Sequence, residues 1–253
     1  MFTGLAEQLA DRYTVVTYDR RGNSRSPLRV PEPLSIEVQA DDAFRLLTHV
    51  GGDEPAFVFG NSSGAIFGLE LARRHPARVR ALVAHEPPIF ELLAEREHWR
   101  TVMLDVEATF AAEGTGPAMQ VFNAGFGGGE ATGEGLGEDG ASAQQPPSEP
   151  DQARAAHLAE VGKAMEKNME VFIGYEVPPV GRYTPDVELL GASSPRIVAA
   201  VGEASEGTPM YRATLALAER LGTKPAVFPG DHGGFGVAPE AFAAKLHEVL
   251  ANP

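Results

Sequence analysis

The sequence predicts an α/β fold, because short β-branched and aromatic runs alternate with longer segments of helical periodicity. Strands are expected at residues 12–19, 56–59, 79–84, 195–202 and 224–228. The first of these runs is apolar almost throughout, which is typical of a strand buried on both faces of a parallel sheet. A serine between two glycines stands at one strand-to-helix boundary. These observations together favour an α/β domain with a functional serine at the end of a strand.

The helices between these strands are predicted from apolar periodicity and from the residues at their ends. Residues 2–11 carry a short apolar face. Ser35 precedes a helix that runs to about residue 50, where two glycines end it. The helix 209–221 begins with a proline and is followed by a glycine, the usual asymmetry of helix ends. A last helix is expected at residues 239–250.

The chain divides into a core and an insertion. Its 253 residues suffice for one α/β domain with an insertion. Residues 1–88 and 191–253 alternate strand and helix, whereas 89–190 show only helical spacing of apolar residues, at 92–110, 117–126 and 151–172. Residues 125–150 are rich in glycine, acidic residues and then Gln, Pro and Ser, so they are predicted to form a mobile loop. An all-helical insertion of this kind is expected to act as a cap over a binding pocket.

Composition excludes several classes of function. Asp and Glu outnumber Lys and Arg by 35 to 21, for a net charge of −14, which disfavours nucleic acid and anionic membranes as partners. There is no cysteine, and therefore no disulfide, thiol nucleophile or cysteine-based metal site. No apolar run is long enough to span a bilayer, and the first residues do not resemble a signal peptide. A small-molecule substrate, no cofactor or metal, and a cytoplasmic location are expected; the oligomeric state is not predicted.

The serine motif has the residue types that nucleophilic catalysis requires. An apolar run ends in Gly60-Asn61-Ser62-Ser63-Gly64, and a helical pattern follows at once. A serine on a sharp strand-to-helix turn presents its hydroxyl at the sheet edge, and flanking glycines allow close backbone approach. The N-terminal N–H groups of the following helix suit an oxyanion. Ser62 is therefore predicted to be the nucleophile, and the Ser63 N–H one oxyanion donor.

A histidine suited to act as the base follows the last strand. His232 lies in the glycine-rich segment 229–235, where a loop can bring its imidazole over the sheet edge to the serine. His85, at the end of the strand 79–84, is the rival candidate. The other histidines are expected at helix faces or ends, where a solvated or capping role is the ordinary one.

These motifs resemble those of serine α/β-hydrolases with a helical cap. The resemblance covers 12–88 and 195–250, and it includes the segment from Tyr18 to Ser26, which is similar to the family's Asp-x-Arg-Gly-x-Gly-x-Ser turn and is interpreted as structural. It implies a mainly parallel sheet flanked by helices. It also implies cleavage of an ester, thioester or lactone of a small, largely apolar substrate through a Ser-acid-His acyl-enzyme mechanism. The alternative is a non-catalytic or weakly active binding protein on the same scaffold.

The acid of this mechanism departs from the family pattern. Relatives often carry Asp in a Gly-x-x-Asp segment after the penultimate strand, but here that position is Ser205. Glu86, at the end of the strand after the serine motif, is favoured as the acid because two prolines fix its exit geometry. Glu203 and Glu206 flank the usual position and remain alternatives. Asp231, beside His232, is interpreted as a turn residue.

The N-terminus is the second departure. The family has about three strands before its first helix, and the loop after the third supplies a second oxyanion N–H. This chain begins at that helix. We therefore expect either that the strands 12–19 and 56–59 pair directly or, as the favoured interpretation, that the sequence is N-terminally short. A short form is expected to be a poor catalyst.

Overall fold

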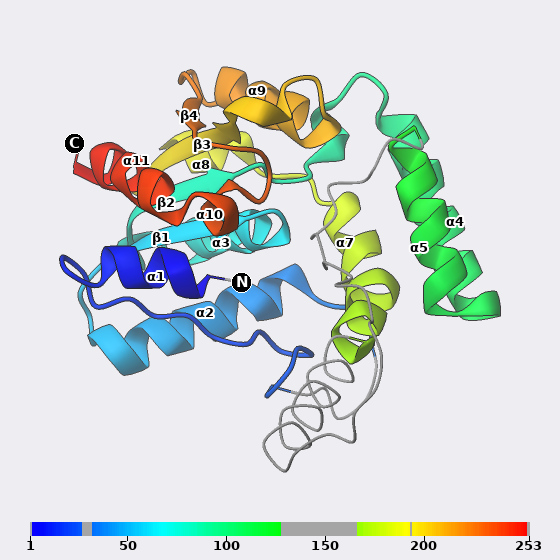
Figure 1. The fold of residues 1–253 in the computed structure, drawn as a ribbon, viewed down its shortest axis with the longest axis horizontal. Helices are drawn as coiled ribbons and strands as arrows, with labels where there is room; N and C mark the ends of the chain where they lie inside the picture. Colours follow the sequence, from blue (N-terminus) through cyan, green and yellow to red (C-terminus); the bar gives the residue numbers. More distant parts are fainter. Residues whose placement is uncertain (1, 27–31, 128–165, 193, 252–253) are drawn as a thin grey trace, which may run out of the picture.

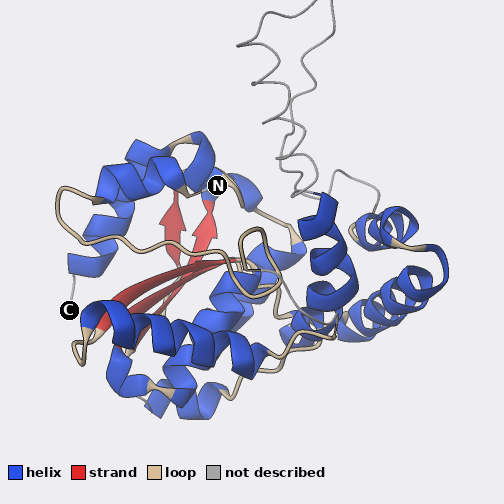
Figure 2. Cartoon of the chain, turned by 90° about the horizontal axis from the view of Figure 1, so that it is seen from below, coloured by secondary structure: helices blue, strands red, loops and turns tan. Residues whose placement is uncertain are grey.

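The computed structural model describes residues 2–26, 32–127, 166–192 and 194–251. Most of the predicted loop 125–150 and most of the predicted helix 151–172 lie outside these residues; Gly125 is the last residue of a helix. Where the chain is described, the predicted α/β architecture is confirmed: a parallel sheet carries helices on both of its faces (Figures 1 and 2). None of the described helices is both long enough and apolar enough to cross a membrane.

The described sheet has four parallel strands in the order β1-β2-β3-β4. They are β1 (Ala56–Asn61), β2 (Val79–His85), β3 (Arg196–Gly202) and β4 (Ala226–Phe228). In the register, Asn61 lies opposite His85, and His85 lies opposite Ala200. The carboxyl ends of all four strands therefore meet at one edge, where open α/β sheets place their ligands.

β1, β2 and β3 direct alternate side chains into two separate cores, whereas β4 contributes Ala226 and Phe228 to one of them and leaves Val227 exposed. On one face, Leu82 and Ala199 contribute to a cluster with α2 (Ile36–Gly51), α3 (Ser63–Arg74), α8 (Val187–Ala192) and α9 (Pro209–Arg220). On the other, Val83 and Ala200 contribute to a cluster with α1 (Thr3–Leu9), α10 (Gly234–Val237) and α11 (Pro239–Ala251). Because both faces of β2 and β3 are covered, these strands read as nearly continuous apolar runs.

The ends of α2 and α9 are formed by capping side chains and by glycine. Ser35 is the N-cap of α2, and its hydroxyl accepts the Val38 N–H. Gly52 ends α2 with a φ of 60°, a conformation that favours glycine. Thr208 caps α9 through the Tyr211 N–H. Short 3-10 turns occupy Pro76–Arg78, Phe90–Leu92 and Glu203–Ser205.

A separate group of helices follows β2 and precedes β3. It contains α4 (Arg96–Glu113), α5 (Thr115–Gly125), a π-helical turn (Phe172–Glu176) and α7 (Val177–Gly181). These elements share their own apolar cluster, in which the Phe90 and Trp99 rings stack with centroids 4.0 Å apart. In Figure 1, α4 and α5 lie on the far side of α7 from the sheet.

The strand predicted at residues 12–19 is wrong. Residues 12 and 13 lie in a turn and a bend, residues 14–19 have no regular secondary structure, and β1 pairs only with β2 among the described strands. The less favoured alternative, a direct pairing of 12–19 with 56–59, is therefore wrong as well. Tyr13 contacts the Phe57 ring edge-on, but Val16 and Tyr18 are 42% and 41% exposed. A β-branched run forms a strand only where another backbone satisfies its N–H and C=O groups, and here the segment contacts the core through side chains alone.

Candidate active site

The turn between β1 and α3 is sharp and strained. Ser62 has a φ of 56° and a ψ of −127°, an unfavourable conformation for a residue with a Cβ atom. Gly60 makes the turn possible. A Cβ at this position would clash with the Gly64 carbonyl group and would lie only 2.7 Å from the Cα of Ala65. A Cβ at Gly64 would meet nothing within 4 Å. The close approach expected at both glycines therefore occurs only at Gly60.

The Ser62 backbone is tied to the neighbouring strand. Its N–H donates to the His85 carbonyl at 2.9 Å, one residue before Glu86. The Ser62 hydroxyl makes no hydrogen bond within the described part of the chain. The Ser63 N–H belongs to the first turn of the 12-residue helix α3, where N–H groups have no acceptor within the helix. The hydroxyl is thus available, and an N–H donor lies beside it.

Glu86 and His232 are in direct contact. The Glu86 carboxylate is fully buried; its Oε2 lies 2.7 Å from Nδ1 of His232, and its Oε1 accepts the Gly202 N–H at 2.8 Å. Burial acts to raise the pKa of Glu86, but the hydrogen bonds from His232 and Gly202 outweigh it, so the pKa is lowered. Glu86 therefore remains ionised and holds Nδ1 of the imidazole, leaving Nε2 for other chemistry.

Backbone strain singles out the same residues. Among the described non-glycine residues, only Ser24, Ser62 and Glu86 have positive φ, and the φ of Glu86 is 47°. Such strain persists where the surroundings over-determine it, which is common at functional sites. Two of the three strained positions are thus the predicted nucleophile and the favoured acid, at the ends of two adjacent strands.

The alternative acids lie elsewhere. Glu203 and Glu206 are exposed, and a Glu203 carboxylate oxygen lies 3.4 Å from the Gly230 N–H rather than on His232. Ser205 is buried and its hydroxyl has no partner among the described residues. Asp231 accepts the Gly233 N–H at 2.9 Å, consistent with its interpretation as a turn residue.

His85, the rival base, is enclosed. Its Nδ1 contacts the Asn61 side-chain oxygen at 2.7 Å, and its Nε2 is buried with no partner in the described residues. Burial lowers the pKa of His85 to about 4, so the ring is neutral at physiological pH. Within the described structure, no hydrogen bond joins the His85 ring to the side chain of Ser62. Its position favours a role in the core behind the site.

One cluster beside the serine escaped the sequence analysis. The Ser63 hydroxyl donates to Oε1 of Glu176 at 2.5 Å, and Arg20 donates to both oxygens of that carboxylate at 2.9 and 3.0 Å. Arg20 belongs to the turn interpreted as structural, and Glu176 to the insertion. These partners are 113 and 156 residues from Glu176 in sequence, and no local pattern signals such contacts.

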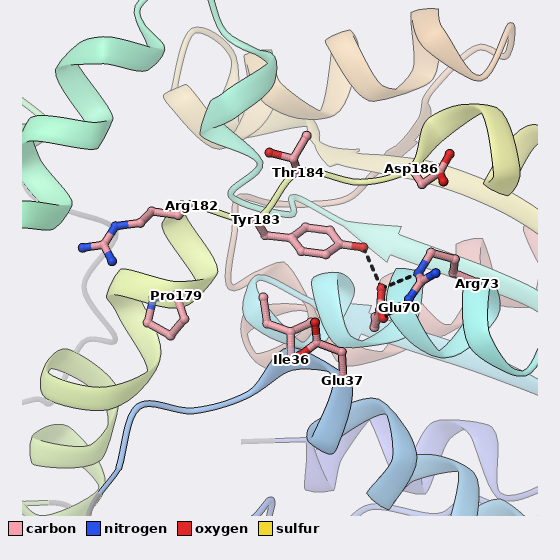
Figure 3. A pocket seen from close by; sticks show the side chains of 9 residues that line it. All are labelled: Ile36, Glu37, Glu70, Arg73, Pro179, Arg182, Tyr183, Thr184 and Asp186. Atoms are coloured by element: carbon pink, nitrogen blue, oxygen red, sulfur yellow. Dashed lines mark hydrogen bonds and ion pairs between the residues drawn. The ribbon is translucent and has the colours of Figure 1, made fainter.

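A cavity of about 420 Å³ is lined by other residues, from α2, α3 and the segment 179–186 (Figure 3). Neither Ser62 nor His232 lines it. Two of its charged groups pair with each other: Arg73 donates to both oxygens of Glu70, which also accepts the Tyr183 hydroxyl at 3.4 Å. Asp186 accepts the Leu189 N–H. Because the charged groups that line the cavity already have partners in the protein, we assign no ligand to it.

The family of the chain follows from comparison with known proteins. A family model described as "alpha/beta hydrolase fold" matches residues 1–122. The chain is also 35% identical over 256 residues to an uncharacterized hydrolase, YraK, of Bacillus subtilis (strain 168), covering 98% of this chain and 83% of that protein. The chain therefore belongs to the α/β-hydrolase family and is a hydrolase of this type.

Solved structures show the same fold. An α/β hydrolase from Sphaerobacter thermophilus DSM 20745 superposes with a TM-score of 0.66 at 24% identity, covering 98% of this chain and 86% of that one. A thermophilic esterase from Thermogutta terrifontis superposes with a TM-score of 0.63 at 20% identity, covering 98% and 84%.

Proposed function

We propose that this protein is a serine hydrolase that cleaves an ester, thioester or lactone of a small, largely apolar substrate. The observation that carries the proposal is the hydrogen bond between Glu86 and His232. Glu86 follows β2, which pairs with β1, the strand that precedes the strained Ser62. A carboxylate on Nδ1 fixes the imidazole orientation and tautomer and stabilises the imidazolium that forms when the serine is deprotonated. The esterase activity of a structural relative is in keeping with this reaction.

The proposed reaction proceeds in two halves. Oγ of Ser62 attacks the substrate carbonyl carbon while Nε2 of His232 takes its proton, and the Ser63 N–H stabilises the oxyanion. Collapse of the tetrahedral intermediate breaks the bond to the leaving group, which receives that proton. A water molecule, deprotonated by His232, then attacks the acyl carbon. The bond between this carbon and Oγ of Ser62 breaks, the carboxylic acid is released, and His232 returns the proton to Oγ. Glu86 stays ionised throughout, in keeping with its lowered pKa.

The free Ser62 hydroxyl is compatible with this scheme. Catalytic hydrogen bonds are often long or poorly aligned before substrate binds and tighten in the Michaelis complex. The register supports the required approach: Asn61 lies opposite His85, so the residues that follow them, Ser62 and Glu86, emerge side by side. His232 is held to Glu86 and therefore lies at the same edge of the sheet.

We propose further that residues 89–190 form a cap over this edge. Two contacts support it: Glu176 contacts Ser63, and Asn168 exchanges two hydrogen bonds with Ser24, at 2.7 and 2.8 Å. Both contacts join the insertion to turns within residues 1–88 of the core. A cap at this edge would exclude water from the reaction.

Active-site labelling tests the function. Wild-type protein should react with a fluorophosphonate probe and hydrolyse 4-nitrophenyl esters of short chains, whereas Ser62→Ala should do neither while keeping its circular dichroism spectrum. His232→Asn should label at least about 10²-fold more slowly, because the general base is lost. Folded wild-type protein that neither labels nor hydrolyses any ester, thioester or lactone in such a series would instead favour a binding protein on a hydrolase scaffold.

A further inference from the structure

The Glu176 carboxylate lies where the insertion reaches the serine turn. Its side chain is 2% exposed and accepts hydrogen bonds from three donors: the Ser63 hydroxyl and two N–H groups of Arg20. Ser63 follows the proposed nucleophile directly, and its N–H is the oxyanion donor identified above. The carboxylate thus contacts the side chain of the residue whose backbone the reaction uses.

Arg20, one of the two partners of Glu176, is itself held in place by packing. The Arg20 guanidinium lies 4.8 Å above the Phe67 ring, on α3 one turn after Ser63. Burial acts to lower the pKa of Arg20, but the Glu176 charge outweighs it, so the pKa is raised and the guanidinium stays charged. The cluster is therefore a neutral ion pair with one additional hydroxyl donor.

The backbone around Glu176 has an uncommon geometry. Residues Phe172–Glu176 form a π-helical turn, a rare conformation that is frequent at functional sites. The carbonyl of Tyr175 accepts the Leu34 N–H at 2.9 Å, which fixes this turn to the segment that precedes α2. The turn thereby directs the carboxylate at Ser63 from a supported backbone.

We propose that Glu176 is a positioning residue that orients the oxyanion donor by holding the Ser63 hydroxyl, with Arg20 neutralising its charge. The hydroxyl and the N–H belong to the same residue, so fixing one restricts the direction of the other. This inference rests on the proposed serine-hydrolase function. Neutralisation by Arg20 is essential to it, because an unpaired carboxylate here would oppose the negative charge that develops on the substrate oxygen.

The simplest test removes only the hydroxyl. Ser63→Ala keeps the N–H, the helix and the Arg20–Glu176 ion pair, so it should fold normally. With a 4-nitrophenyl ester, kcat should fall about 10-fold with KM unchanged, less than the 10²–10³ expected when an oxyanion donor is removed altogether. Ser63→Thr retains a hydroxyl and should recover most of kcat. A Ser63→Ala variant with kcat within about twofold of wild type would overturn the proposal.

A double-mutant cycle then separates positioning from simple anchoring. Glu176→Ala should also lower kcat, and Ser63→Ala/Glu176→Ala should be no slower than the slower single variant, because both changes remove one interaction. Glu176→Gln, whose amide oxygen still accepts the hydroxyl, should retain most of kcat. Effects on kcat that multiply in the double variant would mean that Glu176 acts independently of Ser63, contrary to the proposal.

Glu70 provides a matched control within the same chain. It too is buried and accepts an arginine fork, from Arg73, and a hydroxyl, from Tyr183 (Figure 3). Both Glu70→Ala and Glu176→Ala should lower the melting temperature, but Glu70→Ala should leave kcat unchanged. Wild-type protein that fails to label with fluorophosphonate would overturn both proposals. Active wild type with an equally active Ser63→Ala would overturn only the role of Glu176.

Discussion

Two buried carboxylates on neighbouring elements, Glu70 on α3 and Glu86 after β2, differ in the cation that faces them. Glu70 accepts both N–H groups of the Arg73 fork, at 2.6 and 2.8 Å. Glu86 faces His232 and a backbone N–H, and no arginine or lysine is paired with it in the described structure. Arginine is always charged, whereas histidine gains and loses a proton near neutral pH. Glu70 is therefore suited to a permanent ion pair, and Glu86 to a step in which a proton moves.

The largest difference is expected in turnover. Glu86→Gln removes the charge that stabilises the His232 imidazolium, so kcat should fall by about 10⁴. Glu70→Gln alters an ion pair that no proposed step uses, so kcat should stay within about twofold of wild type. Steady-state kinetics on one 4-nitrophenyl ester compares the two variants directly. Equal losses of kcat would show that the contrast between the carboxylates has no functional meaning.

A second expected effect concerns the two histidines near Glu86. The ring centroids of His85 and His232 are 6.4 Å apart, but His85 contacts the amide of Asn61 instead of a carboxylate. Its pKa of about 4 in the folded protein lies below its ordinary value of 6.5. Between these values the unfolded chain binds a proton that the folded chain does not. The free energy of unfolding should therefore fall as pH decreases from 6.5 to 4, by at most about 3 kcal/mol from this residue.

His85→Phe isolates this contribution. Aromatic rings of Phe59, Phe228 and Phe242 already surround the site. Urea unfolding at several pH values should show a smaller loss of stability on acidification in the variant than in wild type. The readout is the pH slope, because the unpaired Asn61 oxygen adds a cost that does not depend on pH. An unchanged slope would contradict a neutral, buried His85 and weaken its distinction from His232.

The smallest expected effect is a difference in stability between alanine substitutions at the two glycines of the serine turn, Gly60 and Gly64. Gly60→Ala would force a Cβ against the Gly64 and Ala65 backbones, so it should destabilise the protein by roughly 1–3 kcal/mol or more. Gly64→Ala, in the first turn of α3, has open space and should be neutral or stabilising by about 0.5–1 kcal/mol. Thermal unfolding of both variants measures the contrast. Equal destabilisation would show that the turn is enclosed on both sides.

Local signals account for the parts of the site that the sequence predicted. The turn at Ser62 was recognisable because a strand, a glycine-flanked serine and a helix follow one another within about twenty residues. Ser205 at the family's usual acid position showed that another carboxylate is needed. Glu86 was favoured because two prolines fix its exit from the strand, and the structure places its carboxylate on His232. The catalytic roles of these residues remain predictions.

The cluster of Glu176 with Ser63 and Arg20 depends on contacts that no local sequence pattern encodes. The sequence by itself determined which segments become strands and helices wherever a segment's own periodicity, caps and glycines suffice. It was wrong at residues 12–19, because a strand requires a partner backbone and β-branched composition does not supply one. Only the tertiary structure decided that Glu176 contacts Ser63 and Arg20, since residues more than a hundred positions apart meet through the packing of whole elements.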